Sequence, residues 1–395
     1  MNYKSIRHTI IVVMMMKCPR CGNRDPHLIG QLNGRYYCRA CIQFNRQFLD
    51  EQHFDKPQIQ TVHETVTYHL DFVLSTQQQK ISDQLILNYE RGINTSVMAV
   101  CGSGKTEMTY AVIAKVINRG GRVCFAIPRR ALCVELYERI KAHFSGISIG
   151  LFYGGCHLHY DAPLIVCTTH QLYRFVDNPF ELVLLDEADA FPYYKDRVLQ
   201  AILKSCVKRC CIKMSATLCD DDQKDGEILI MNRRYHGANL PLPHILLVPR
   251  RYWLSLIKKK INQMIKEQKR ILIYVPLIAD VPQYVQLLRP WFRVKGVSSH
   301  SSGINEAVSM LRDDQIDVLV TTTILERGMT VENVQVFVMN ASHKIYDERT
   351  LMQIAGRVGR SVNFPSGDIY FIDQCFSKEM KSCIATINSL NQDTV

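Results

Sequence analysis

Residues 96–110, SVMAVCGSGKTEMTY, join a short apolar run to a glycine-rich turn and then to a run with helical spacing. Strand, loop and helix in this order let backbone amides at the helix N-terminus hold phosphate groups. Lys105 would contact the β- and γ-phosphates, and Thr106 would bind Mg²⁺. The expected nucleotide-binding loop comprises Ala99, Val100, Cys101, Gly102, Ser103, Gly104, Lys105, Thr106 and Glu107. Many ATPases and GTPases share such a loop, so it predicts phosphate binding and leaves the function open.

Ala99 occupies a position where the common phosphate-loop pattern, G-x-x-x-x-G-K-[ST], has glycine. Alanine is acceptable there if the backbone needs no positive φ. A second motif supports a working nucleotide site, because Asp186 and Glu187 directly follow the apolar run 182–185. Asp186 would hold Mg²⁺, and Glu187 would orient and activate the attacking water.

Short apolar runs alternate with longer stretches of helical spacing on both sides of the loop. The expected strands are 96–100, 122–128, 164–169, 182–187 and 210–217, then 270–276, 317–323, 334–340 and 368–373. Alternation of this kind predicts parallel sheets covered by helices. The fold class is therefore α/β, and the expected domains are 1–65, 66–240 and 241–395, with a hinge at NLPLPH, 239–244.

The first expected domain carries two Cys-x2-Cys pairs separated by sixteen residues. This spacing suits a tetrahedral four-sulfur zinc site, whose ligands would be Cys18, Cys21, Cys38 and Cys41. The intervening residues predict a hairpin that turns at Asn33-Gly34. Two redox pairs or unrelated thiols are the alternative. Basic and aromatic residues around the pairs suit either nucleic acid or a docking protein.

The composition is that of a globular protein, and the net charge of +11 favours polyanionic partners such as nucleic acid or an acidic membrane surface. A generally basic protein explains the charge equally well. Most of the 15 cysteines lie in apolar runs, as Cys124 and Cys167 do, which indicates a reducing cytosol. The apolar N-terminal run HTIIVVMMMK, 8–17, is not expected to be a signal peptide, because no cleavage site follows it.

Taken together, the motifs resemble those of superfamily 2 helicases and translocases, whose phosphate loop has the form A-x-x-G-x-G-K-T. DEAD at 186–189 looks like their second motif, and the others follow in the family's order. The resemblance covers about residues 70 to 375 and implies two tandem RecA-like domains. It implies adenine reading by Gln78, nucleic-acid contacts by Pro128, Arg129, Gly154, Gly155, Thr169, His170 and Thr321, and coupling of hydrolysis to domain movement by Ser215, Ala216, Thr217 and Gly328.

The segment QIAGRVGR, 353–360, looks like the family's last motif and is expected to begin a helix. Arg357 and Arg360 would then share one helix face and reach the γ-phosphate as arginine fingers. Gln353 would lie on the same face and position the water. The two glycines, 356 and 359, favour close approach to another surface over an ordinary exposed helix.

A four-cysteine module ahead of two compact motor domains, with DEADAFP and QIAGRVGRS, resembles the ComFA family of late-competence ATPases. That resemblance implies ATP, Mg²⁺ and Zn²⁺ as cofactors and single-stranded DNA as a partner. It also implies a role in DNA import during natural transformation. The protein would be cytoplasmic and could bind peripherally at the inner face of the cell membrane. The resemblance further implies contacts with ComFC and the ComEC channel, and self-assembly. An RNA helicase, a replication-restart DNA helicase and a non-enzymatic zinc-stabilised DNA-binding scaffold remain alternatives.

Overall fold

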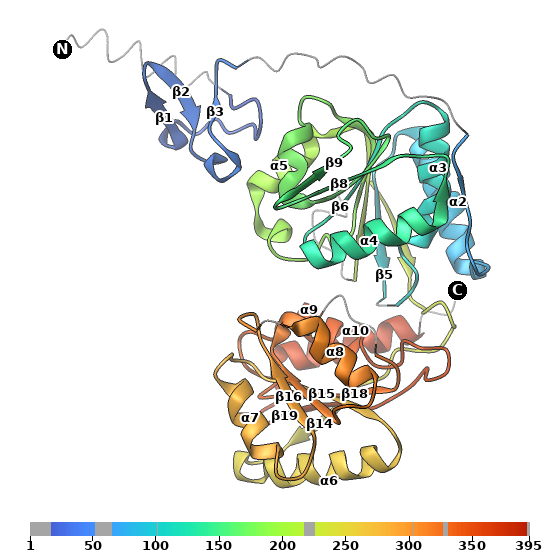
Figure 1. The fold of residues 1–395 in the computed structure, drawn as a ribbon, viewed down its shortest axis with the longest axis vertical. Helices are drawn as coiled ribbons and strands as arrows, with labels where there is room; N and C mark the ends of the chain where they lie inside the picture. The colour runs from blue at the N-terminus through green and yellow to red at the C-terminus, as the bar shows by residue number, and fades with distance from the viewer. Residues whose placement is uncertain are drawn as a thin grey trace, which may run out of the picture. The chain divides into compact units, whose positions relative to one another are not determined.

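The computed structural model describes residues 17–51, 65–100, 102–216, 226–301, 303–326 and 331–392 (Figure 1). Expectations for Cys101, Thr217, Gly328 and the N-terminal run before Lys17 therefore lie outside the described residues. The chain divides into two compact units, Met1–Val97 with Thr106–Leu229 and Met98–Lys105 with Ile230–Val395. The domain limits at 65 and 240 stay predictions.

A small antiparallel sheet, together with the turns beside it, forms the module that contains the four cysteines. It consists of β1 (Ile29–Leu32), β2 (Arg35–Cys38) and β3 (Gln47–Phe48), with short 3-10 turns at η1 (Pro26–Leu28) and η2 (Ile42–Phe44). The predicted hairpin is confirmed, because Leu32 pairs with Arg35 across the two-residue turn. Asn33 and Gly34 both have positive φ, 48° and 79°, which suits a type I′ turn.

The first unit holds most of an eight-stranded sheet in the order β13-β5-β12-β11-β6-β10-β8-β9. In chain order the strands are β5 (Thr95–Ala99), β6 (Val123–Ile127), β8 (Ile149–Tyr153), β9 (Cys156–Leu158), β10 (Leu164–Thr168), β11 (Phe180–Leu185), β12 (Val207–Ser215) and β13 (Glu227–Met231). The five strands from β12 to β8 pair in parallel, and β9 is antiparallel to β8. The strands predicted around residues 96, 122, 164, 182 and 210 are thereby confirmed.

The helices of this unit are α2 (Thr76–Arg91), α3 (Tyr110–Asn118), α4 (Arg130–His143) and α5 (Arg197–Ser205), with 3-10 turns η3 (Glu107–Thr109), η4 (Thr169–Phe175) and η5 (Tyr193–Lys195). A separate pair joins β4 (Thr67–Tyr68) to β7 (Phe144–Ser145). The core between α5, η4 and the sheet includes Cys124 and Cys167, so the predicted buried thiols are confirmed.

The second unit contains a six-stranded sheet in which every neighbouring pair is parallel. Its order is β14 (His244–Leu247), β19 (Ile369–Asp373), β18 (Val334–Met339), β15 (Arg270–Tyr274), β17 (Val318–Thr321) and β16 (Val294–Val297). Turns η6 (Arg250–Tyr252) and η7 (Thr323–Glu326) complete it, together with the helices α6 (Trp253–Lys266), α7 (Asp280–Leu288), α8 (Ile304–Arg312), α9 (Glu348–Ala355) and α10 (Lys378–Gln392).

Alternate residues of the central strand β15 enter two different cores. Leu272 and Tyr274 pack with α8, α9 and α10, whereas Ile271 and Ile273 pack with α6 and α7. Successive side chains of a strand point to opposite faces, so helices cover this sheet on both sides. The two tandem parallel-sheet domains and the preceding cysteine module agree with the predicted fold class.

Candidate functional site

The phosphate loop runs from the end of β5 to η3. Gly102 and Gly104 have φ values of 80° and 75°, a region that glycine enters without strain. Ala99 is instead the last residue of β5, where the backbone is extended, so a side chain at this position is tolerated. Thr106 is buried and precedes η3, which leads into α3. The loop therefore has the strand, turn and helix that the sequence predicts.

The loop residues 98–105 belong to the second unit. Val100 is part of that unit's core cluster, and its backbone N–H donates to the carbonyl of Met231 at 3.1 Å. A Cβ atom added at Gly102 would lie 3.5 Å from Cγ of Arg360. The structure thus brings one predicted arginine finger against the predicted phosphate loop, two segments more than 250 residues apart in the chain.

The acidic pair lies directly after the buried strand β11. The backbone N–H of Asp186 donates to the carbonyl of Ala126 at 3.0 Å, and a carboxylate oxygen of Asp186 accepts from the N–H of Glu187 at 2.8 Å. Glu187 has a positive φ of 53°, which is uncommon for a residue other than glycine, asparagine or aspartate. Such conformations cost free energy and cluster at functional sites.

The segment predicted to couple hydrolysis to movement adjoins this pair. The N–H of Ala188 donates to the carbonyl of Met214 at 3.0 Å, one residue before Ser215. Ser215 and Ala216 are both buried at the end of β12. The acidic turn and the end of β12 are thus joined by a backbone hydrogen bond, and the coupling role of Ser215 and Ala216 stays a prediction. Thr217, the third residue of the segment, lies outside the described part of the chain.

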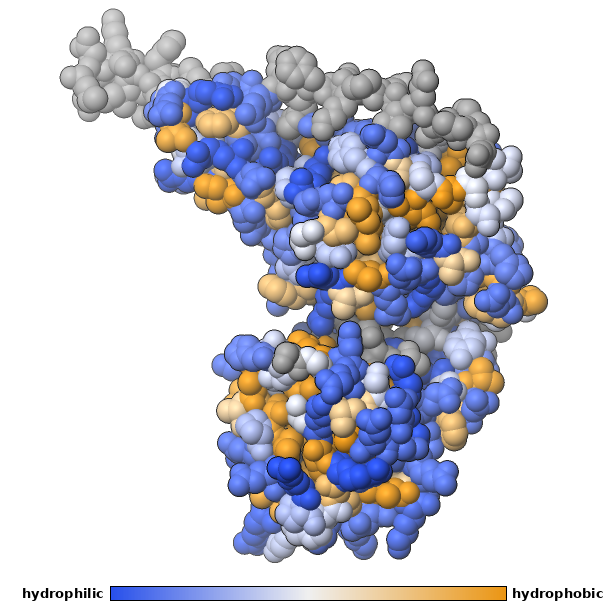
Figure 2. Space-filling model, viewed as in Figure 1, coloured by the Kyte–Doolittle hydropathy of each residue, from blue (hydrophilic) through white to orange (hydrophobic). Residues whose placement is uncertain are grey.

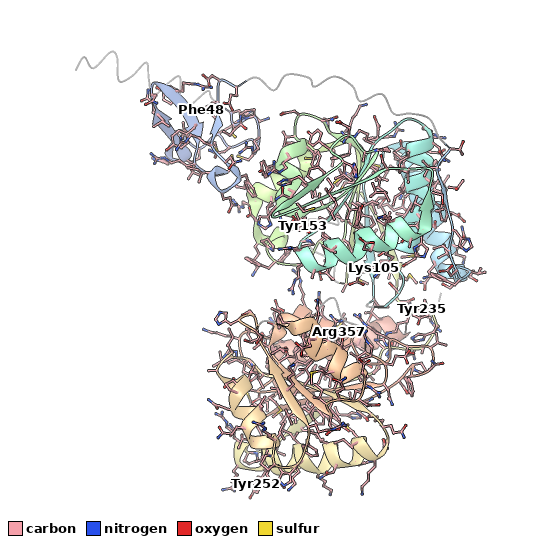
Figure 3. The ribbon with its side chains drawn as sticks, viewed as in Figure 1. Phe48, Lys105, Tyr153, Tyr235, Tyr252 and Arg357 are labelled. Atoms are coloured by element: carbon pink, nitrogen blue, oxygen red, sulfur yellow. The ribbon has the colours of Figure 1, made fainter. Side chains whose placement is uncertain are left out.

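Predicted nucleic-acid residues of the first motor gather at one edge of the sheet. Strands β6, β10 and β8 are parallel neighbours, so their carboxyl ends meet at the same edge. The segments that follow these ends are 128–129, 169–170 and 154–155, and Tyr153 at the end of β8 is labelled in Figure 3. Ligands of open α/β sheets bind at the carboxyl ends of the strands. Thr321 is buried at the end of β17, and its hydroxyl donates to the carbonyl of Thr322 at 3.1 Å.

Gln78 has a local structural role. Its side-chain oxygen accepts from the N–H of Ser75 at 2.7 Å, while the Ser75 hydroxyl oxygen accepts from the N–H of Gln78 at 3.3 Å. This capping box begins α2. The adenine-reading role of Gln78 stays a prediction.

The predicted helix at QIAGRVGR is wrong, because α9 spans Glu348–Ala355 and ends before both arginines. Asp347 caps its start by accepting from the N–H of Thr350 at 2.8 Å. Gly359 has a φ of 72°, and an added Cβ would lie 2.5 Å from the carbonyl oxygen of Pro365. Arg357, labelled in Figure 3, is therefore held in a turn after the helix rather than on a helix face.

Residues 234–236 support this turn, and the sequence reasoning missed them. The buried guanidinium of Arg234 donates to the carbonyl oxygens of Val358 and Gly356, the latter at 3.3 Å. The hydroxyl of Tyr235 donates to the carbonyl of Arg360 at 3.3 Å. A ring nitrogen of His236 lies 3.1 Å from the carbonyl oxygen of Gly359. The sequence contains one signal that points to these residues. The cluster RRYH, 233–236, lies just ahead of the expected hinge and belongs to none of the motifs.

Replacing Arg234 with alanine should lower the free energy of unfolding by about 3 kcal/mol, because charged hydrogen bonds are lost and buried carbonyls are left without a donor. Urea unfolding measures this loss, and ATP turnover should fall with it. Arg233→Ala is the matched control, since Arg233 is exposed. Equal stability of the two variants would contradict the support of the 356–360 turn by Arg234.

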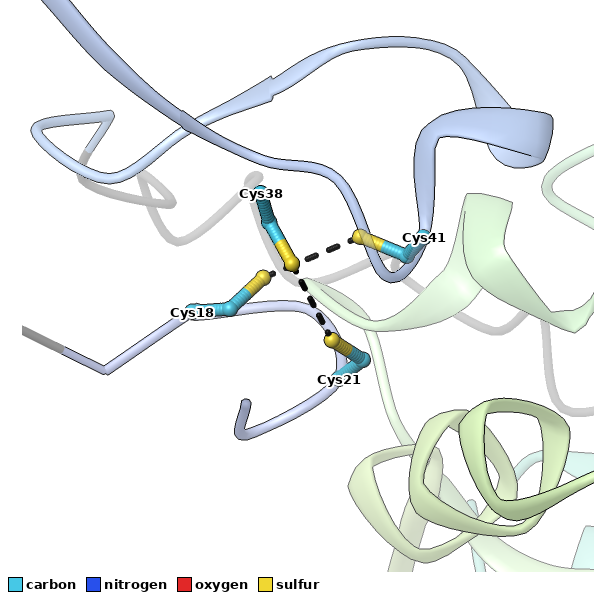
Figure 4. Close-up of side chains that lie close together, drawn as sticks. All are labelled: Cys18, Cys21, Cys38 and Cys41. Atoms are coloured by element: carbon cyan, nitrogen blue, oxygen red, sulfur yellow. Dashed lines mark hydrogen bonds between the residues drawn. The ribbon is translucent and has the colours of Figure 1, made fainter. Parts of the chain in front are cut away.

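The four predicted metal ligands converge beside the small sheet, at the end of β2 and in the neighbouring turns (Figure 4). Their Sγ atoms all lie within 4.8 Å of one another, with Cys18–Cys41 at 3.8 Å and Cys21–Cys38 at 3.7 Å. A tetrahedron with Zn–S bonds of about 2.3 Å has edges of roughly 3.8 Å. Hydrogen bonding among the four sulfur atoms lowers the pKa of Cys18 and Cys38 and raises the pKa of Cys21 and Cys41, as expected of thiols that share protons at close range. The donor set and its spacing therefore fit zinc.

Comparisons with known proteins agree with this geometry. Residues 75–225 match the DEAD/DEAH box helicase family and residues 254–362 match the helicase conserved C-terminal domain. Competence protein ComFA of Streptococcus pneumoniae is 35% identical over 383 residues, which cover 91% of this chain and 87% of that protein. The chain belongs to the ComFA family. The ComFA of Bacillus subtilis is 32% identical over 401 residues, covering 95% of this chain and 86% of that protein.

The fold extends beyond the family. Dbp5 of Saccharomyces cerevisiae, solved bound to RNA and ADP BeF3, is similar with a TM-score of 0.55 and 16% identity, covering 82% of this chain and 93% of that chain. The matching helicase domains and ComFA relatives make this ComFA family member an ATP-hydrolysing enzyme of the helicase type. Within the described ranges, no helix combines the length and apolar character required to cross a bilayer.

Proposed function

We propose that this ComFA family member is a motor that uses ATP to move along single-stranded DNA and drives DNA import in natural transformation. The observation that carries the proposal is the shared sheet edge. Asp186 and the segments 128–129, 154–155 and 169–170 all follow carboxyl ends of neighbouring parallel strands. Hydrolysis and strand contact at one edge would let a change at the phosphate alter the grip on the nucleic acid.

The proposed chemistry assigns one task to each residue. Lys105 neutralises charge on the β- and γ-phosphates, and Thr106 and Asp186 hold Mg²⁺ through oxygen atoms, the ligands that this ion prefers. Glu187 accepts a proton from the attacking water, which Gln353 helps to position. Arg357 and Arg360 stabilise the charge that develops during phosphoryl transfer. The Arg360 side chain next to Gly102 supports this assignment.

Arg129, His170 and the backbone at Gly154 and Gly155 would hold the sugar-phosphate chain. Such contacts position a strand without reading its bases. Gly154 and Gly155 are exposed in the turn between β8 and β9, so their amides are accessible to a phosphate. Thr321 would contribute from the second motor, and Ser215, Ala216, Thr217 and Gly328 would couple hydrolysis to movement.

The cellular location and the partner proteins are proposed from family membership. We propose a cytoplasmic protein that works at the inner face of the cell membrane with the ComEC channel and with ComFC, and that self-assembles. The net charge of +11 supports attraction to a polyanionic strand.

ATP turnover measured with single-stranded DNA, duplex DNA, RNA and no nucleic acid tests the proposed function. We expect single-stranded DNA to stimulate turnover at least about tenfold, and stimulation should weaken with added salt because phosphate contacts release counterions. Stronger stimulation by RNA would favour an RNA helicase. Unwinding of forked duplexes would favour a replication-restart enzyme.

A further inference from the structure

A cavity of about 650 Å³ lies where the zinc module meets the first motor, and both of its sides belong to the first compact unit. It is lined by Gln43 from the module and by His170, Phe191, Lys195 and Arg197 from the motor, with Pro192, Asp196 and Val198. Its size is within the range of about 300–1,000 Å³ found for ligand pockets. The phosphate loop, the acidic pair and the arginine turn contribute none of these residues.

We propose that this cavity takes one unstacked base of single-stranded DNA, with Phe191 as the stacking surface. The inference deepens the proposed function and rests on it. Phe191 is 81% exposed, more than any other phenylalanine, tyrosine or tryptophan in the described part of the chain. A phenylalanine left in water has no packing role, whereas stacking on a base removes both apolar surfaces from solvent.

Positive charge in the lining of the cavity suits the DNA backbone. Lys195 and Arg197 are exposed and line the same cavity, and His170 follows the end of β10 among the predicted strand contacts. Asp196 is the one acidic lining residue, and its carboxylate accepts from the N–H groups of Val198 and Leu199 at 2.9 and 3.0 Å. Asp196 keeps its negative charge while it caps α5, but Lys195 and Arg197 together outweigh it, so the charged lining residues are net positive.

The zinc module provides the opposite wall through Gln43. Phe44 is buried, and its ring centroid lies 5.9 Å from that of His170 and 5.7 Å from that of Tyr173. Arg20 donates to the carbonyls of Phe44 and Asn45 at 2.9 and 2.8 Å. These contacts present the exposed Gln43 amide to the cavity, where it has both donors and an acceptor for a base edge.

The visible face of the module is otherwise mostly hydrophilic (Figure 2). A polar wall from the module, facing a motor segment with an exposed aromatic ring and two cations, fits a nucleotide better than an apolar peptide, which would bury a larger continuous apolar patch. Base stacking tolerates any sequence, as an import motor requires.

Binding of a fluorescein-labelled oligothymidylate to the full chain, followed by anisotropy, tests the proposal. We expect Phe191→Ala to weaken binding roughly tenfold, as for the loss of one stacked base, and Phe191→Trp to bind nearly as well as the unchanged protein. Lys195→Gln and Arg197→Gln should each reduce the slope of log affinity against log salt concentration by about one. Phe376→Ala removes another exposed ring, outside the cavity, and should bind normally.

The outcomes separate this proposal from the proposed function. If the unchanged protein binds the oligonucleotide and Phe191→Ala binds equally well, the cavity is not a base site and the motor assignment stands. If the unchanged protein binds no single-stranded DNA, the proposed function fails and the base site fails with it. Tighter binding of oligouridylate with the same dependence on Phe191 would make RNA the occupant and overturn the DNA assignment.

Discussion

Replacing Lys105 with alanine should reduce ATP turnover by at least about 10²–10³-fold, the typical cost of removing one charge-stabilising group from a transition state. Lys105 follows the two positive-φ glycines of the loop, and its ammonium is the charge that the sequence assigns to the β- and γ-phosphates. Steady-state phosphate release, with and without single-stranded DNA, measures the loss.

Lys115→Ala is the matched control, because Lys115 lies in α3 directly after the loop and its ammonium pairs with Glu90 at 2.6 Å on the surface. A surface ion pair contributes at most about 1 kcal/mol to stability, so turnover should be retained. Undiminished turnover in Lys105→Ala would show that the chemistry resides elsewhere. An unchanged protein that binds DNA but never hydrolyses ATP would favour the non-enzymatic scaffold.

The sequence predicts those parts of the fold and the site that depend on local patterns. The apolar run 96–100 forms β5, and the turn at Asn33-Gly34 closes the predicted hairpin. Both succeed because strand burial and turn geometry are encoded within a few neighbouring residues. The cysteine spacing likewise brings four sulfur atoms together, since each pair forms its own turn and one hairpin joins them.

Features of the fold and the site that depend on tertiary contacts are not predicted by sequence patterns. The turn after α9 is held by Arg234, more than 120 residues earlier in the chain, so helical spacing alone misplaces Arg357 and Arg360. The cavity at Phe191 is missed for the same reason, because its walls come from segments about 150 residues apart. Contacts of this kind leave no periodic signal in the sequence.

Replacing Cys38 with serine should reduce bound zinc from one atom per chain to nearly none. Structural zinc sites in small modules contribute about 10–16 kcal/mol of apparent binding free energy at neutral pH, and most of this is folding free energy. Cys38 ends β2, where it pairs with Ile29, and its sulfur lies 3.7 Å from that of Cys21. Zinc released to a colorimetric chelator, per mole of purified protein, measures the effect.

Cys375→Ser is the matched control, because Cys375 is an exposed thiol outside the cluster and its loss should leave the zinc content at one. A zinc content far below one in the unchanged protein, purified without chelator, would contradict the four-cysteine site. Removing zinc from the unchanged protein with a chelator should reproduce the behaviour of Cys38→Ser, which excludes a misfolding effect of the substitution itself.

Loss of zinc should also weaken binding of single-stranded DNA, because Phe44 lies three residues after Cys41 and packs against His170. When the cysteine turns lose their metal, the module that positions Phe44 and the Gln43 wall loses its main source of stability, and the ring contacts of Phe44 with His170 and Tyr173 remain as the principal restraint. Cys38→Ser should therefore lose both zinc and DNA affinity, whereas Phe191→Ala should lose affinity with its zinc retained. Normal DNA affinity in the zinc-free chain would show that zinc stabilises only the module and that the module forms no part of the DNA-binding surface.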